Sequence, residues 1–133
     1  MEGSTAPDGT SALPGAGIGC GQARDLARRL LERLRVPPER IADVDTVVTE
    51  LVSNADRHAG GVTGFSVVPR PGVVLIAVSD ASPRLPQQRP WAPAEPGGFG
   101  WLLINRLART DVHHTPHGKT ITARIPTTET AGP

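Results

Sequence analysis

Hydrophobic residues recur every three or four positions in two early segments of the chain, and this spacing predicts two amphipathic helices. The first covers residues 21–35, with leucines on its buried face and arginines on the outer one. Pro37 and Pro38 separate it from the second, because proline ends one helix and is well placed to open the next. The second runs to about Ala59, where Gly60 and Gly61 end it.

The pattern changes after residue 61 to short β-branched runs, which are typical of strands. Residues 84–96 are rich in proline and glutamine and have no period, so we expect a loop there, and a loop of this length inside a domain is typical of a functional lid. The glycine cluster at 97–100 then leads into a third helix with an apolar stripe. The predicted strands are residues 64–68, 73–79, 111–115 and 119–125.

Helices gather early in the chain and strands gather late. This order predicts an α+β domain, a two-layer sandwich in which the helices pack on one face of a mixed, mainly antiparallel sheet. We expect one folded domain over residues 20–126, with flexible tails at 1–19 and 127–133, where small and polar residues dominate.

Composition narrows the classes of function. The chain has 133 residues and a net charge of +1, and this balance argues against nucleic acid as the main partner. One cysteine excludes an intramolecular disulfide and fits a reducing compartment. The start of the chain has no signal-peptide pattern, and no apolar run approaches the roughly 18 residues of a membrane span. We therefore expect a cytoplasmic protein without a membrane partner.

A ladder of polar side chains follows one side of the second predicted helix. Glu50, Asn54 and His58 are spaced by four residues, so they lie one above another beside the apolar face. The amide oxygen of Asn54 suits Mg²⁺, which takes few protein ligands, and Glu50 has the chemistry of a general base. The alternative is that both are ordinary surface residues of a helix.

Three later features add to this ladder. Asp80 ends a predicted buried strand, where a carboxylate selects a ligand that carries an amino group, although it could equally cap a turn. Gly97, Gly98 and Gly100 open a helix, so they form either a phosphate seat or a hinge. Thr120 would add a hydroxyl beside Asp80 if their strands are neighbours. Lys119 is expected to face solvent.

Two other patterns carry less weight. His113, His114 and His117 lie on a predicted hairpin without a neighbouring carboxylate or cysteine, so a zinc site is disfavoured. The glycines at positions 15, 17, 19 and 21 follow no strand and lack the spacing of a dinucleotide-binding loop.

In order along the chain, these features resemble the motifs of the GHKL (Bergerat-fold) ATP-binding domains of gyrase, heat-shock chaperones, MutL and sensor histidine kinases. ELVSNADRHA at 50–59 resembles the N box, SDASPRLP at 79–86 the first glycine box, and GGFGWLLINRLA at 97–108 the second. HGKTITARI at 117–125 resembles the closing strand. The form of the first box, the short lid and the lack of a dimerisation or transducer domain resemble stand-alone anti-sigma-factor serine kinases of the RsbW and SpoIIAB type, especially the single-domain versions of actinobacteria.

The resemblance implies ATP and Mg²⁺ as cofactors. It implies that Asn54 ligates Mg²⁺, that Glu50 is the catalytic base, and that Asp80 reads the adenine amino group with support from Thr120. Gly98 and Gly100 would line the phosphates. The residues that it assigns to nucleotide binding are Asn54, Arg57, His58, Asp80, Ser82, Pro83, Gly97, Gly98, Phe99, Gly100 and Thr120.

The function implied is a protein serine/threonine kinase that regulates transcription by partner switching. Its partners would be a sigma factor and an antagonist (anti-anti-sigma) protein, and relatives of this type often form homodimers. The alternative is a binding module that holds ATP and sequesters a regulatory partner without chemistry. The catalytic half of a histidine kinase is disfavoured, because no phosphoacceptor helix precedes the domain.

Overall fold

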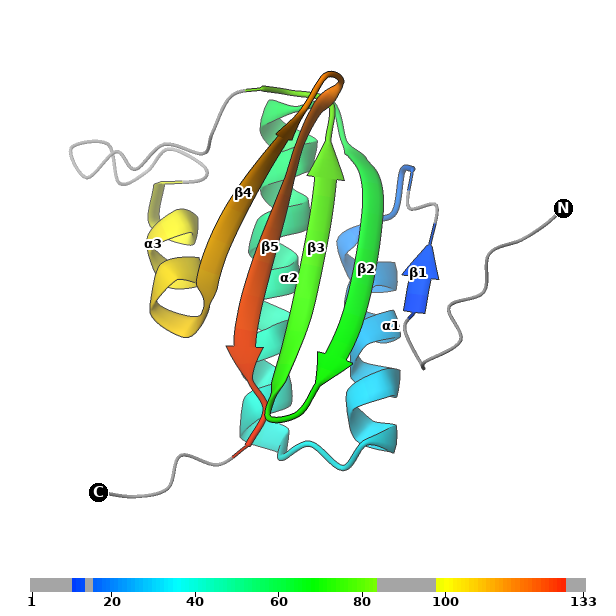
Figure 1. The fold of residues 1–133 in the computed structure, drawn as a ribbon, viewed down its shortest axis with the longest axis vertical. Helices are drawn as coiled ribbons and strands as arrows, with labels where there is room; N and C mark the ends of the chain where they lie inside the picture. The colour runs from blue at the N-terminus through cyan, green and yellow to red at the C-terminus, as the bar shows by residue number, and fades with distance from the viewer. Residues whose placement is uncertain (1–10, 14–15, 84–97, 129–133) are drawn as a thin grey trace, which may run out of the picture.

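The structure is a computed structural model that describes residues 11–13, 16–83 and 98–128. Figure 1 shows a sheet with helices behind it. In chain order, the elements of the described residues are β1 (Ser11–Leu13), α1 (Cys20–Arg33), α2 (Pro38–His58), β2 (Val62–Arg70), β3 (Val73–Asp80), α3 (Gly98–Leu107), β4 (Arg109–Thr115) and β5 (Gly118–Pro126).

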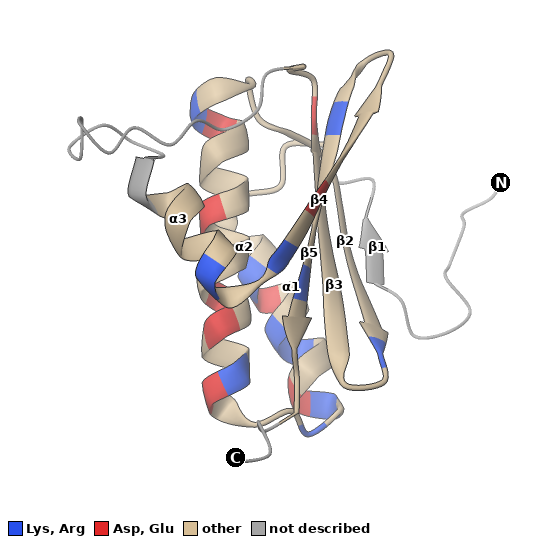
Figure 2. Ribbon diagram, turned by 60° about the vertical axis from the view of Figure 1, so that its left-hand side comes forward, with Lys and Arg blue, Asp and Glu red and all other residues tan. Residues whose placement is uncertain are grey.

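The strands form one open sheet in the order β1-β2-β3-β5-β4, and every pair of neighbours in it is antiparallel. α1 and α2 lie side by side on one face of this sheet, and α3 lies beside β4 (Figure 1). Seen after a turn of 60°, α2 and α3 stand on the same side of the sheet (Figure 2). The predicted arrangement, helices on one face of a mainly antiparallel sheet, is therefore what the structure has.

The core lies between α2 and the sheet. α2 begins at Pro38, which lies in its first turn. The helix ends where the N–H of Ala59 and the N–H of Gly61 both donate to the carbonyl of Ala55. Gly60 and Gly61 have φ angles of +75° and +114°, which glycine adopts at little cost. The residues that α2 buries are Ile41, Val44, Val47, Val48, Leu51, Val52, Asn54 and Ala55.

β3 shows how the sheet contributes to this core. Its residues alternate strictly between half-buried and buried positions, as expected when one face of a strand is covered. Val74, Ile76 and Val78 lie on the covered face, and each is at most 2% exposed. The next position on that face is Asp80, so the same alternation carries a carboxylate into the buried layer.

Most predicted elements are confirmed within a few residues, with two differences. β2 is longer than expected, because Pro69 and Arg70 still pair with β3 after the apolar run has ended. β1 lies in the segment expected to be a flexible tail. Three residues pair there with β2, and the nearby Ile18 is 6% exposed. A strand of three residues carries too little pattern to predict, since its backbone hydrogen bonds place it.

Charged contacts also join α1 to α2. Arg24 donates a hydrogen bond of 3.0 Å to the hydroxyl of Thr49, and Arg28 forms an ion pair with Asp45. The hydrogen bond that Arg28 donates to the Asp45 carboxylate raises the pKa of Arg28, so its guanidinium stays charged at any physiological pH. Among the described helices, none has the length and apolar character needed to cross a lipid bilayer.

Candidate functional site

Asn54 and Asp80, two of the predicted site residues, lie at one end of the molecule, on the inner side of the sheet. Figure 1 shows that the C-terminal end of α2, the end of β3 and the turn between β4 and β5 all lie at that end. Asn54 and Asp80 are both 6% exposed, and they lie on the sides of α2 and β3 that face the core. The fold therefore directs an amide from the helix and a carboxylate from the sheet toward the same layer.

Asn54 has an incomplete set of hydrogen bonds. Its Oδ1 accepts a bond of 3.2 Å from Arg57, one turn further along α2. Its Nδ2 is buried and has no hydrogen-bond partner among the described residues. A buried donor without a partner costs free energy, so it is typical of a position that a ligand completes. Asn54 fits the Mg²⁺ role that the resemblance implies, because Oδ1 is a neutral oxygen ligand and Nδ2 is free to bind an anionic acceptor.

Glu50 lies one turn before Asn54 on α2 and faces α3. A Cβ built on Gly100 would lie 2.6 Å from Glu50 Oε1 and 2.9 Å from its Cδ, so a side chain there would require the Glu50 carboxylate to move. The first turn of α3 therefore lies directly against the Glu50 carboxylate, and glycine leaves room for that carboxylate in its present position.

Asp80 is held by two groups at the end of β3. Its Oδ1 accepts hydrogen bonds of 3.0 Å from Lys119 Nζ and 2.9 Å from the backbone N–H of Ser82. Lys119 Nζ also donates to the Ser82 carbonyl at 3.0 Å. The Ser82 contact is the turn cap that the sequence left open as an alternative. The carboxylate is thus both a cap and half of a buried ion pair.

Two expectations about β5 are wrong. Lys119 was expected to face solvent, yet it is 4% exposed and is paired with Asp80. Thr120 was expected beside Asp80, yet its hydroxyl shares a hydrogen bond of 2.7 Å with Ser79 on the other face of the sheet. The register explains both results, because Asp80 lies opposite Lys119 and Ser79 lies opposite Thr120. Since neighbouring residues of a strand point to opposite faces, only Lys119 can reach Asp80.

Gly118 is a structural position that the sequence analysis did not single out. Its φ is +151°, and a Cβ there would lie 2.0 Å from the backbone oxygen of Asp80. The start of β5 therefore crosses directly against the end of β3, and this approach keeps Lys119 opposite Asp80. The available signal was a glycine directly before the lysine in a hairpin turn.

The remaining predicted residues lie around this core of the site. Arg57 and His58 are exposed at the end of α2, Ser82 is half-buried and Pro83 is exposed. Gly98 and Phe99 form the first turn of α3, where the structure describes the backbone only. Gly97 and the predicted lid at 84–96 lie outside the described residues. In the described part of the chain, no group of three or more His, Cys, Asp or Glu side chains could hold a metal ion.

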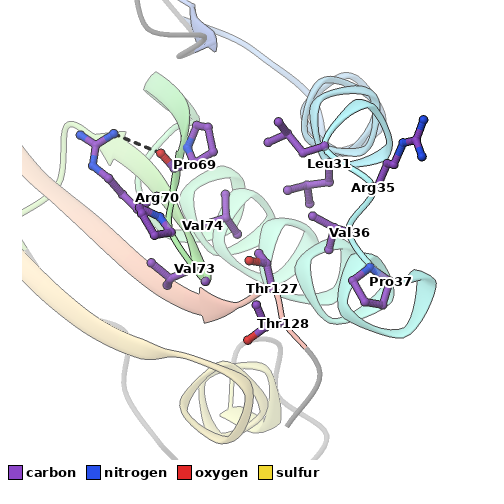
Figure 3. Close-up of a pocket in the computed structure, with 13 residues that line it drawn as sticks. Leu31, Arg35, Val36, Pro37, Pro69, Arg70, Val73, Val74, Thr127 and Thr128 are labelled. Carbon is purple, nitrogen blue, oxygen red and sulfur yellow. Dashed lines mark hydrogen bonds between the residues drawn. The ribbon is translucent and has the colours of Figure 1, made fainter. Parts of the chain in front are cut away.

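A separate cavity of about 580 Å³ lies at the other end of the sheet. Figure 3 shows it between the end of α1, the turn from β2 to β3 and the residues that follow β5, with Leu31, Val36, Pro69 and Val74 among its apolar lining. None of the predicted site residues lines it. The candidate site is therefore the end that holds Asp80, on chemical grounds, and this cavity is a different feature.

Comparisons with known proteins bear on the family and the fold. The family model "Histidine kinase-like ATPase domain" matches residues 19–125. A similar solved structure is the histidine kinase domain of a blue-light activated histidine kinase from Erythrobacter litoralis, with a TM-score of 0.52 and 18% sequence identity. The match covers 88% of this chain and 66% of that chain, so this chain spans somewhat less than two thirds of the relative. No curated protein matches.

The likeness to the histidine kinase domain concerns the fold, and it confirms the predicted α+β architecture of helices on an antiparallel sheet. The family match covers most of the chain and includes Glu50, Asn54, Asp80 and Lys119. The protein therefore belongs to the histidine kinase-like ATPase domain family and is an ATP-binding domain of the GHKL superfamily.

Proposed function

We propose that the protein is a Mg·ATP-dependent serine/threonine protein kinase that acts on a partner protein and regulates transcription by partner switching. In this proposal the two partners are a sigma factor and the antagonist that competes for it, and the setting is the cytoplasm. The observation that carries the nucleotide part is the amide of Asn54, buried and with Nδ2 unpartnered among the described residues, on the same inner side as the Asp80 carboxylate.

The proposed reaction assigns one task to each side chain. The adenine amino group donates to Asp80, and the phosphates lie toward α2 and the first turn of α3. The antagonist's hydroxyl oxygen forms a bond to the γ-phosphorus while the bond from that phosphorus to the β,γ-bridging oxygen breaks. Glu50 takes the hydroxyl proton, and ADP leaves with the bridging oxygen. Catalysis of this kind depends mainly on positioning and on stabilisation of charge.

Magnesium, when bound, neutralises charge that develops on the phosphate oxygens. Asn54 would hold it through Oδ1, and water and phosphate oxygens would supply the other ligands. Arg57 already donates to Oδ1, so this guanidinium fixes the orientation of the amide. Because Oδ1 is oriented in this way, we expect Nδ2 to donate its hydrogen bond to the bound nucleotide.

Two features support a catalytic role for Glu50 rather than a structural one. First, the structure gives no ion pair or hydrogen bond to its carboxylate from the described residues, so its oxygens are available for a proton. Second, the same carboxylate lies directly against Gly100 in the first turn of α3, which places the proposed base next to the helix start where phosphates would lie.

The test is transfer of labelled γ-phosphate from ATP to a purified antagonist protein, followed by mapping of the modified residue. We expect Mg²⁺-dependent labelling of a serine or threonine, and none when that residue of the antagonist is replaced by alanine. No transfer to any antagonist of the host, with ATP bound, would overturn the kinase proposal in favour of a nucleotide-binding module.

Two variants separate binding from chemistry. Glu50→Gln should bind ATP as the wild type does and lose phosphoryl transfer, because only the proton acceptor is removed. Asp80→Asn should weaken ATP binding by roughly 10-fold or more, since the charged acceptor is lost. Glu39→Gln and Asp111→Asn make the same chemical changes at exposed positions in the first turn of α2 and on β4, and both should behave as the wild type.

A further inference from the structure

The buried ion pair between Lys119 and Asp80 is unusual for a lysine. Lys119 is 4% exposed and Asp80 is 6% exposed, with 3.0 Å between Nζ and Oδ1. Removing two charges from water is expensive, and an apolar pair would fill the same positions at the end of the core with less penalty. The pair therefore calls for a role beyond packing.

The hydrogen-bonding capacity of this pair is only partly used. A lysine ammonium has three N–H groups, and within the described residues two of them go to Asp80 Oδ1 and to the Ser82 carbonyl. Oδ1 of Asp80 accepts from Lys119 and from the Ser82 N–H, whereas no described residue donates to Oδ2. Asp80 as a whole keeps 6% of its surface exposed. One donor and one acceptor thus remain side by side.

A ligand that uses both groups must carry a donor next to an acceptor. The Watson–Crick edge of adenine has this pattern, with the exocyclic amino group beside the ring nitrogen N1. In the proposed function, the adenine amino group donates a hydrogen bond to Asp80. Adenine N1 then lies on the side of the Lys119 N–H that has no acceptor among the described residues.

We propose that Lys119 is a specificity-determining residue that donates a hydrogen bond to adenine N1 while Asp80 Oδ2 accepts from the amino group. This inference rests on the proposed ATP binding and adds a second contact to the base. Hypoxanthine and guanine reverse the order of donor and acceptor on this edge, so they cannot make both contacts in the same position. A buried charged donor left without its partner is a strong source of discrimination.

The test compares the affinities of three nucleotides by calorimetry. ATP carries both groups, 1-deaza-ATP replaces N1 by C–H, and purine riboside triphosphate lacks the amino group. We expect the wild type to bind 1-deaza-ATP roughly 10- to 100-fold more weakly than ATP, the loss typical of a hydrogen bond from a charged group. In Lys119→Met that difference should disappear, while purine riboside triphosphate should still bind more weakly than ATP. Arg124→Met, on the exposed side of β5, is the matched control and should keep the wild-type pattern.

Equal affinity of the wild type for ATP and 1-deaza-ATP would overturn the inference and leave ATP binding intact. An equal loss in the wild type and in Lys119→Met would overturn it as well, because the N1 contact would then come from another group. If no triphosphate binds the wild type, the proposed function itself fails. If Lys119→Met does not fold, the nitrogen NMR shift of N1 in ¹⁵N-labelled ATP bound to the wild type decides. A shift typical of hydrogen bonding from a cation supports the inference, and an unchanged shift overturns it.

Discussion

Replacing Gly100 by alanine tests the contact between α3 and the proposed base. The new Cβ would lie 2.6 Å from Glu50 Oε1, 2.9 Å from Cδ and 3.0 Å from Oε2. These are atoms at the far end of a flexible side chain, so we expect the Glu50 carboxylate to move and the two helices to stay in place. Restoring ordinary van der Waals contact requires a displacement of several tenths of an ångström up to about 1 Å.

The effects on stability and on activity should therefore differ in size. Alanine in place of glycine inside a helix stabilises it by about 0.5–1 kcal/mol, and moving Glu50 from its preferred rotamer costs about 0.5–1.5 kcal/mol. These two contributions nearly cancel, so the free energy of unfolding should change by less than about 1 kcal/mol. Phosphoryl transfer should fall by roughly 100-fold, because a base displaced by about 1 Å loses its alignment with the hydroxyl proton.

The free energy of unfolding is measured by urea denaturation, and transfer is measured with labelled ATP at saturating concentration. Gly21→Ala is the control, because Gly21 lies in α1 and a Cβ there meets no atom within 4 Å. It should gain stability and keep full activity. The reasoning is refuted if Gly100→Ala keeps wild-type transfer, or if it unfolds the protein while Gly21→Ala does not.

Three further predictions concern individual positions. Gly118→Ala should lower the free energy of unfolding by about 1–3 kcal/mol more than Gly60→Ala does, because a Cβ at Gly118 meets the Asp80 backbone oxygen at 2.0 Å and a Cβ at Gly60 meets no atom within 4 Å. Equal losses in urea denaturation would contradict this. Arg35→Gly should gain about 0.5 kcal/mol, because Arg35 ends α1 at a φ of +60° that glycine adopts more easily, and a lower melting temperature would argue against it. Asn54→Leu should keep or raise the free energy of unfolding without nucleotide, because it removes an unpartnered buried donor, and it should lose the thermal shift that Mg·ATP gives. A loss of more than about 2 kcal/mol in the free energy of unfolding would mean that the amide stabilises the fold.

The sequence was sufficient for the elements whose pattern is set by one covered face. α2 and β3 were predicted because their apolar residues repeat at 3.6 and 2 positions over many residues. β1 was missed, because three residues cannot show a period and backbone pairing with β2 places them. The end of β2 was missed for a similar reason, since Pro69 and Arg70 pair with β3 without adding to the apolar face.

The site was harder to predict than the fold, and β5 shows why. A shift of one residue in the register would exchange Lys119 and Thr120 between the two faces of the sheet. That register depends on how closely the turn at Gly118 approaches the end of β3, and such a tertiary contact leaves no periodic signal. Asn54 was found because it belongs to a polar ladder beside the apolar face of the second helix, and Asp80 was found because it ends a predicted buried strand. Lys119 was assigned to solvent because most strand lysines are exposed.

The polar residues of the site replace apolar residues at the same end of three different elements. On the buried face of α2, Asn54 comes one turn after Leu51. On the covered face of β3, the residue after Val78 is Asp80. On the covered face of β5, the residue before Ile121 is Lys119. Apolar side chains in these places would continue the core and would be more favourable for folding, since each buried charge costs free energy. Stability alone would not retain an amide, a carboxylate and an ammonium together in one buried layer. We infer that a polar ligand completes their hydrogen bonds, and the proposed adenine nucleotide would meet an acceptor, a donor and an unpartnered amide in that layer.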